Sequence, residues 1–193
     1  MNEVLKDRLN KVLDRITSPE LLSNSGLGNE IGYYIFDYPP ESELEIREHV
    51  AFVIDKARKK CPELRIAHLN LFELLVDYLK ERGLLTEAMK LQRQKGDDAL
   101  LKALKGPLHQ EKIAKALVNR CDPDQLDLVI MSGVGSAWPM IRTHNLLNAL
   151  HPLMAKTPLV IFYPGKYDGQ TLSLFGRLKN SDEPYYRAFQ LVS

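Results

Sequence analysis

The sequence has only two cysteines, no cluster of potential metal ligands and almost no net charge. Cys61 and Cys121 are 60 residues apart in a chain of 193, so disulfides are not the main source of stability and both residues are expected to be free thiols. A zinc site needs closely spaced Cys and His ligands, and this chain has none in such spacing. We therefore predict no metal and no cofactor.

Targeting and membrane-spanning segments are also lacking. The first eight residues are charged and amphipathic, which is unlike the apolar core of a secretory signal peptide. No run approaches the roughly 18 consecutive apolar residues that a membrane-spanning helix needs. The net charge of +1 gives no general attraction to nucleic acid or to an anionic membrane. These features predict a cytoplasmic protein that does not associate with membranes.

What remains is the composition of a soluble globular domain, with 45% hydrophobic and 26% charged residues. Two runs near the C-terminus, 128–131 and 159–163, are apolar at every position. Such strands must be covered on both faces, which indicates the middle of a parallel sheet. We predict a single domain over 1–193: a three-layer α/β fold with a mostly parallel sheet flanked by helices, a helical insertion at 84–120 and a C-terminal β-hairpin.

Helices are expected to alternate with strands along most of the chain. The predicted strands are 33–36, 64–69, 127–131, 159–163, 172–175 and 186–192. Asn70 is expected to cap the helix that follows the second strand, and Gly83 to end that helix. Pro139 is expected in the first turn of the helix that follows the third strand.

The loop after the third strand is the first candidate site. Gly133 and Gly135 lie between a strand and a helix, so their amides and the helix N-terminus could bind an anion. The loop lacks the third glycine of a dinucleotide fingerprint, and the chain has no P-loop motif. We favour a tight turn that packs the helix on the sheet, and retain anion binding as the alternative. Asp37, after the first strand, could ligate magnesium only if a phosphate site existed beside it.

Arg142 and His144 are the second candidate, in the first turns of the following helix. The guanidinium could bind a phosphate or a carboxylate, and the imidazole could exchange protons near neutral pH. No G-x-S-x-G nucleophile motif accompanies them, and Ser132 has no obvious acid partner in the sequence. A structural role at the sheet edge is the favoured interpretation, and a hydrolase that uses the Gly133–Gly135 loop is the alternative.

Two further segments are typical of interaction surfaces. Lysines recur at helical spacing in the predicted insertion, at positions 102, 105, 112 and 115. They indicate a solvated face or a docking site for an acidic partner or the DNA backbone. The tail combines Arg177, Tyr185, Tyr186 and Arg187 around a polar turn, and arginine and tyrosine are enriched in interface cores. A terminal hairpin that seals the sheet edge would also explain the tail.

Six short motifs, in one order, extend over most of the chain. They are GLGNE at 26–30, SGVG at 132–135, PMIRTHNLLN at 139–148, FYPG at 162–165, FGRL at 175–178 and YYRAF at 185–189. Together they resemble the BrxB family, a domain of unknown function found in the BREX bacteriophage-exclusion systems. The resemblance implies a role in anti-phage defence, beside a DNA methyltransferase, a large P-loop ATPase and a phosphatase-like protein named PglZ.

The resemblance carries no catalytic residues, because none is defined for the family. From it we expect a non-enzymatic assembly subunit that acts through protein–protein contacts, first of all with PglZ, and so supports host DNA methylation and phage exclusion. The predicted contact residues are Arg142, His144, Arg177, Tyr185, Tyr186 and Arg187. A homodimer and an indirect association with DNA inside the complex stay open.

Overall fold

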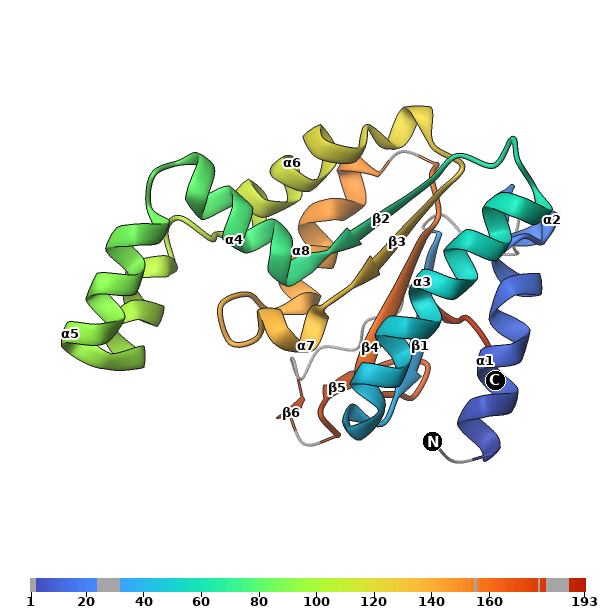
Figure 1. Ribbon diagram of the computed structural model, residues 1–193, viewed down its shortest axis with the longest axis horizontal. Helices are drawn as coiled ribbons and strands as arrows, with labels where there is room; N and C mark the ends of the chain where they lie inside the picture. The colour runs from blue at the N-terminus through green and yellow to red at the C-terminus, as the bar shows by residue number, and fades with distance from the viewer. Residues whose placement is uncertain (1–2, 24–31, 155, 177, 180–187) are drawn as a thin grey trace.

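The computed structural model describes residues 3–23, 32–154, 156–176, 178–179 and 188–193, the pair 178–179 by its backbone (Figure 1). Its helices are α1 (Glu3–Ile16), α2 (Pro19–Leu22), α3 (Glu43–Lys60), α4 (Leu71–Glu81), α5 (Leu85–Leu104), α6 (Gln110–Cys121), α7 (Val134–Ala137) and α8 (Thr143–Leu150). Its strands are β1 (Tyr33–Tyr38), β2 (Ile66–Asn70), β3 (Leu128–Ser132), β4 (Leu159–Tyr167), β5 (Leu172–Leu174), β6 (Leu178–Lys179) and β7 (Ala188–Gln190). Short 3-10 turns occupy Pro40–Ser42, Pro123–Gln125 and His151–Leu153.

The strands form a mostly parallel sheet in the order β2-β3-β4-β1-β7, which confirms the predicted fold class. Both fully apolar strands, β3 and β4, lie inside this order, as their composition predicts. Strand β4 runs beyond the sheet and pairs antiparallel with β5, which pairs with β6. The last strand, β7, returns to pair parallel with β1 at the edge.

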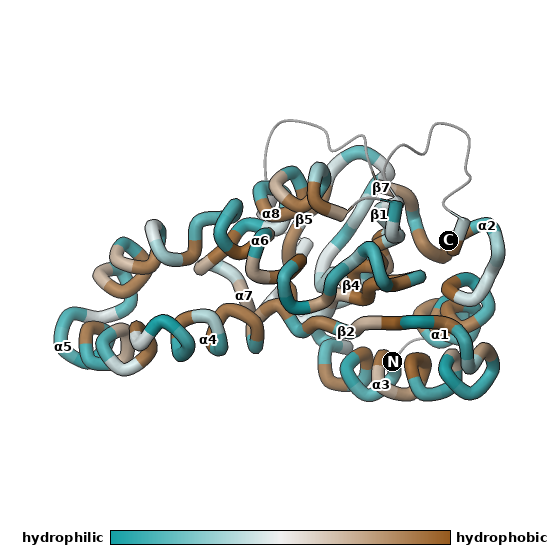
Figure 2. Tube along the Cα trace, turned by 90° about the horizontal axis from the view of Figure 1, so that it is seen from above, coloured by the Kyte–Doolittle hydropathy of each residue, from teal (hydrophilic) through white to brown (hydrophobic). Residues whose placement is uncertain are grey.

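Each face of the sheet has its own apolar core, because successive strand residues point to opposite sides. On one face Tyr34 and Phe36 pack with α1, α2 and α3. On the other face Tyr33 and Ile35 pack with α4, α6, α7 and α8. Figure 2, seen from above, places α1 and α3 on one side of the strands and α6 and α8 on the other.

Helix α4 begins and ends where the sequence predicts. The Asn70 side chain accepts hydrogen bonds from the backbone amides of Phe72 and Glu73, which caps the N-terminus. At the other end Gly83 has φ +67, and the amide of Leu84 bonds the carbonyl of Leu79, a pairing that satisfies a free helix carbonyl.

Helices α5 and α6 differ in how far they join the core. Helix α6 packs against α8, and its residues Ile113, Ala114 and Leu117 have no exposed surface. Helix α5 projects away from the sheet (Figure 1), bends at Gly96 and buries only Leu104. Both helices lie within the predicted insertion at 84–120, but α6 is part of the layer that covers the sheet.

Two elements differ from the sequence prediction. Strand β4 continues through Pro164 and Gly165 to Tyr167, four residues beyond the predicted end at 163. The helix expected after the glycine loop is divided into α7 and α8, with Pro139 between them after a cis peptide bond. No helix among the described residues is long and apolar enough to cross a membrane.

Candidate functional site

The carboxyl ends of the parallel strands are where α/β sheets usually bind ligands, at the point where neighbouring connections leave toward opposite faces. Strand β1 continues into α3 on one face, and β3 continues into α7 and α8 on the other. Strand β4 lies between β1 and β3. The candidate site is therefore the region at the carboxyl ends of these three strands, where this class of fold usually has its binding crevice, and we call it the sheet-edge crevice.

The chain itself fills part of this crevice with the β4–β5 extension. Gly165 opposes Leu174 in that antiparallel pair. A Cβ atom on Gly165 would overlap the backbone carbonyl of Ser173 and lie 3.0 Å from the amide nitrogen of Phe175. Glycine therefore lets the two strands of the extension approach closely, which brings Phe175 to the edge of the crevice.

The glycines of the 132–136 loop also serve close packing. Gly133 has φ +70, a conformation that favours glycine, and a Cβ there would overlap the Oδ1 atom of Asn70. A Cβ on Gly135 would lie 2.8 Å from Cγ of Pro164 and 3.2 Å from the ring of Phe175. The loop thus fits against the cap of α4 on one side and the β4–β5 extension on the other. Anion binding by this loop stays a prediction.

Asp37, at the end of β1, is held by residues from three other segments. Its Oδ1 atom accepts hydrogen bonds from Arg8 at 2.6 Å and from the Gln190 side chain at 2.7 Å, and its Oδ2 atom accepts one from the Tyr167 amide at 3.1 Å. Arg8 also donates to the carbonyls of Asp37 and Val192. Both oxygens of the carboxylate are therefore engaged in joining α1, β4 and the chain end.

A serine–histidine pair lies at the edge of the sheet beside the crevice. The Ser132 Oγ atom is 2.8 Å from Nε2 of His68. Ser132 is buried, whereas the His68 side chain reaches solvent from the edge strand β2. Partial desolvation lowers the pKa of His68, the charge of Arg58 acts in the same direction, and the charge of Glu73 opposes both.

Sequence reasoning missed this pair because it depends on strand register. His68 faces Ile130 in the parallel ladder, and Ser132 lies two residues further along the same face of β3. The separation of 64 residues gives no local pattern that would join the two side chains. The sequence signal was only that a serine ends an apolar strand, where side chains of parallel sheets often carry function.

The structure places Arg142 and His144 together in the first turn of α8 but in different environments. Arg142 precedes the helix and is exposed, and its side chain makes no hydrogen bond or ion pair within the described part of the chain. His144 is buried, and its Nε2 atom lies 3.0 Å from the side-chain Nδ2 atom of Asn148, one turn later. The guanidinium is therefore available for a partner, whereas the imidazole offers little surface to one.

The other predicted contact residues are not part of the described structure. Arg177, Tyr185, Tyr186 and Arg187 lie outside the described residues, and their role stays a prediction. In the described ranges, no group of three or more His, Cys, Asp or Glu side chains is placed to hold a metal ion.

Comparison with known proteins gives the chain its family. The family described as BREX protein BrxB matches residues 67–191. The chain belongs to the BrxB family. A BREX protein BrxB from Escherichia coli O9:H4 (strain HS) is 41% identical over 192 residues, covering 100% of this chain and 94% of that protein. One from Bacillus cereus (strain H3081.97) is 40% identical over 192 residues, covering 97% of each. No solved structure matches the chain.

The BrxB match begins inside β2 and ends just after β7. It therefore includes His68, Ser132, the glycine loop and the β4–β5 extension, and leaves out α1 and β1, which supply Arg8 and Asp37. The two BrxB relatives are similar along the whole chain, so they extend the likeness to this N-terminal part. The resemblance that the sequence motifs indicated is confirmed.

Proposed function

We propose that this BrxB-family chain is a non-catalytic subunit that assembles a BREX complex through protein–protein contacts, with a PglZ-like protein as its first partner. In this proposal the complex works in the cytoplasm and supports host DNA methylation and phage exclusion. DNA is reached indirectly, through other components. The family membership of the chain supports the BREX assignment.

One observation carries the non-catalytic part of the proposal. At the sheet-edge crevice, where this class of fold usually binds ligands, the described groups make hydrogen bonds and packing contacts within the chain. Asp37 is bonded to Arg8, Gln190 and Tyr167. Gly133 and Gly135 are packed against neighbouring elements so closely that even a methyl group would collide.

The surface that we assign to the partner includes the exposed Arg142 and the tail residues Arg177 and Arg187. Arginine contributes strongly to interfaces because its planar guanidinium binds carboxylates in a bidentate way and packs on apolar groups. Arg142 meets this requirement within the described chain, since no neighbour there neutralises it. His144 is the weaker member of the predicted set, because it is buried.

A pull-down from cells that express the complete defence cluster tests this proposal. The tagged chain is expected to retain the PglZ-like protein, and Arg142→Glu or the pair Arg177→Glu and Arg187→Glu should weaken that association. Circular dichroism and the melting temperature should stay unchanged. Arg93→Glu, an exposed change on α5, is the matched control. An unaltered complex would refute the assigned surface, and recovery of no BREX component would refute the assembly role.

The Ser132–His68 contact favours one alternative, a hydrolase or anion-binding domain at the sheet-edge crevice. A histidine beside a serine hydroxyl is the starting geometry for nucleophilic catalysis. Incubation of the purified chain with a panel of esters and phosphate compounds tests this alternative. Turnover that disappears in Ser132→Ala would overturn the non-catalytic proposal, and no turnover across the panel would leave it standing.

A further inference from the structure

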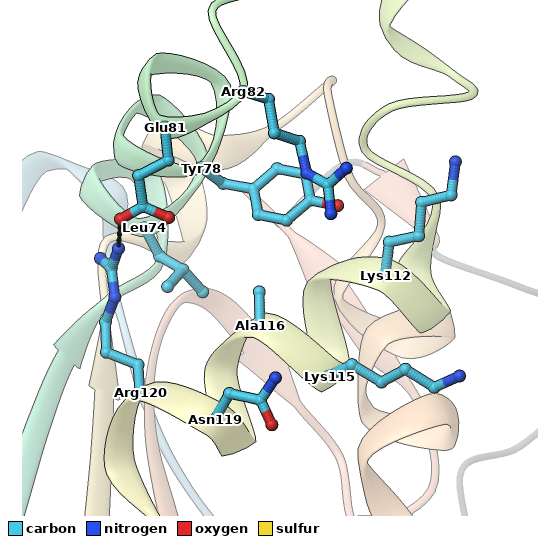
Figure 3. A pocket seen from close by; sticks show the side chains of 9 residues that line it. All are labelled: Leu74, Tyr78, Glu81, Arg82, Lys112, Lys115, Ala116, Asn119 and Arg120. Atoms are coloured by element: carbon cyan, nitrogen blue, oxygen red, sulfur yellow. Dashed lines mark hydrogen bonds and ion pairs between the residues drawn. The ribbon is translucent and has the colours of Figure 1, made fainter.

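A groove lies between α4 and α6, away from the sheet-edge crevice (Figure 3). Its volume is about 590 Å³. The side chains of Leu74 and Tyr78 line it from α4, and Ala116 lines it from α6. Its lining extends from position 74 to the α4 cap at 82, and from 112 to 120 on α6, and eight steps at the rise of an α-helix correspond to about 12 Å. The groove is therefore long enough for about two turns of another helix.

Positive charges gather at one end of this groove, and none of them forms an ion pair with a described residue. Arg82 stacks on Tyr78, with its guanidinium carbon 4.4 Å from the ring centroid, and the Lys115 side chain makes no hydrogen bond or ion pair to any residue that the structure describes. Among the described residues, the Lys112 side chain donates only to the backbone carbonyl of Gly106, at 2.9 Å. Three cations thus surround one small surface without an ion pair to any carboxylate that the structure describes.

The other end of the groove is neutralised. Arg120 there binds Asp77 at 3.0 Å and Glu81 at 2.6 Å, so its charge is already matched. Figure 3 shows Arg120 turned toward Glu81, with Lys112 and Lys115 on the far side of Ala116. The groove is therefore polarised: it has an apolar floor, one compensated end and one positive end.

We propose that this groove binds an acidic helical segment of a partner protein, which deepens the assembly role proposed above and depends on it. Apolar residues of the segment lie on Leu74, Tyr78 and Ala116. Its Asp or Glu side chains, one turn apart, reach the positive end of the groove. This is the helix-in-groove mode of recognition, with charge complementarity that fixes the direction of the helix.

The same observations disfavour a nucleic acid in this groove. A phosphate backbone requires positive charge along its whole path, and here Asp77 and Glu81 occupy one end. Single-stranded bases stack on open aromatic faces, whereas Arg82 already covers the ring of Tyr78. Tyrosine and arginine around a small apolar floor are instead the residue types that dominate protein interfaces.

Photo-crosslinking inside cells that express the complete defence cluster tests the proposal. p-Benzoylphenylalanine replaces Asn119, an exposed residue of the groove, and in a parallel strain it replaces Gln94, an exposed residue of α5 outside it. Mass spectrometry then maps the crosslinked segment. The expected result is a protein segment with acidic side chains at helical spacing, crosslinked from Asn119 and not from Gln94.

Charge reversal in the groove supplies the quantitative test. A synthetic peptide of the mapped segment should bind the purified chain about tenfold more weakly when Arg82→Glu and Lys115→Glu are combined, since two interface charges are reversed. The control combines Lys102→Glu and Lys105→Glu, exposed lysines that change the net charge equally but do not line the groove, and should leave affinity within about twofold.

The outcomes separate this inference from the assembly role. Crosslinks to DNA, crosslinks to a segment without acidic residues, or crosslinking no stronger than at Gln94 would overturn the groove assignment. If one of these results occurs and the tagged chain still retains BREX components in a pull-down from the same cells, the groove alone is refuted and the assembly role stands. Equal losses of affinity in the groove and control variants would also overturn the assignment, because they would indicate general electrostatic attraction.

Discussion

The sheet-edge crevice and the groove between α4 and α6 are two regions of the same domain whose polar groups are used differently. In the crevice, Asp37 is bonded to three other segments and Gly135 packs on Pro164 and Phe175. In the groove, Arg82 and Lys115 face the opening without carboxylate partners among the described residues. At the place where α/β proteins usually bind ligands, these described groups make contacts within the chain, whereas the two cations of the helical layer make no ion pair with any described residue.

The largest loss of stability is expected from removal of the Asp37 carboxylate. Asp37→Ala leaves the Arg8 guanidinium with a side chain only 17% exposed and without its carboxylate. Removal of one partner from such a buried pair costs about 3–5 kcal/mol of unfolding free energy. Chemical denaturation measures the loss.

Asp55→Ala is the matched control for that change. The ion pair of Asp55 with Lys59 lies on the surface of α3, with the two side chains 55% and 71% exposed. Its loss should cost less than about 1 kcal/mol. Equal effects of the two substitutions would contradict the structural role of Asp37.

A smaller loss is expected from a methyl group added inside the crevice. Gly135→Ala places a Cβ atom 2.8 Å from Pro164, so the loop or the β4–β5 extension must move, at a cost of about 1–3 kcal/mol. Gly106→Ala adds the same group where nothing lies within 4 Å, and it should be neutral or slightly stabilising. Melting temperatures of the two variants compare them, and a tolerated Gly135→Ala would mean that the crevice is loosely packed.

The pH dependence of stability reports on the solvent-exposed side of the crevice. The pKa of His68 is lower in the folded chain than its ordinary value of 6.5, so the unfolded chain takes up a proton first as the pH falls. Stability should therefore decrease as the pH falls below about 6.5 and until the folded imidazole is also protonated. Denaturation curves at several pH values should show a weaker decrease for His68→Gln. An unchanged slope would show that other groups cause it.

The smallest effect is expected in the groove, where a change should alter binding and leave stability intact. Lys115→Glu replaces an exposed side chain that bonds to no described residue, so the unfolding free energy should change by less than about 0.5 kcal/mol. Thermal and chemical denaturation check this. A large loss of stability would mean that the lysine supports the helical layer itself.

The sequence predicted those parts of the fold that depend on local chemistry. The apolar strands 128–131 and 159–163, the Asn70 cap and the Gly83 helix end all follow from residues within a few positions of one another. The strand pairing that creates the crevice depends on register, and no local pattern contains it. The sequence therefore did not pair Ser132 with His68, and Asp37 was considered as a metal ligand although Arg8 binds it.

The continuation of β4 shows why a familiar local signal can mislead. Pro164 followed by Gly165 is typical of a turn, yet here both lie in a strand. Proline is tolerated at position 164 because the ladder of β4 with β3 ends at Ile161, although Pro164 still pairs with Tyr38 of β1. Glycine is needed at position 165 because the carbonyl of Ser173 lies so close. The same dipeptide therefore serves strand and turn, and only the neighbouring chain decides between them.

Arg8 joins the first helix to the final residues of the chain, since it donates to both Asp37 and the Val192 carbonyl. The two chain ends lie close together at one end of the molecule, and α5 lies at the other end (Figure 1). A bulky domain fused to either chain end would therefore lie on the side of the molecule away from α5. A reporter attached at either chain end could therefore detect a partner that binds near α5 without blocking it.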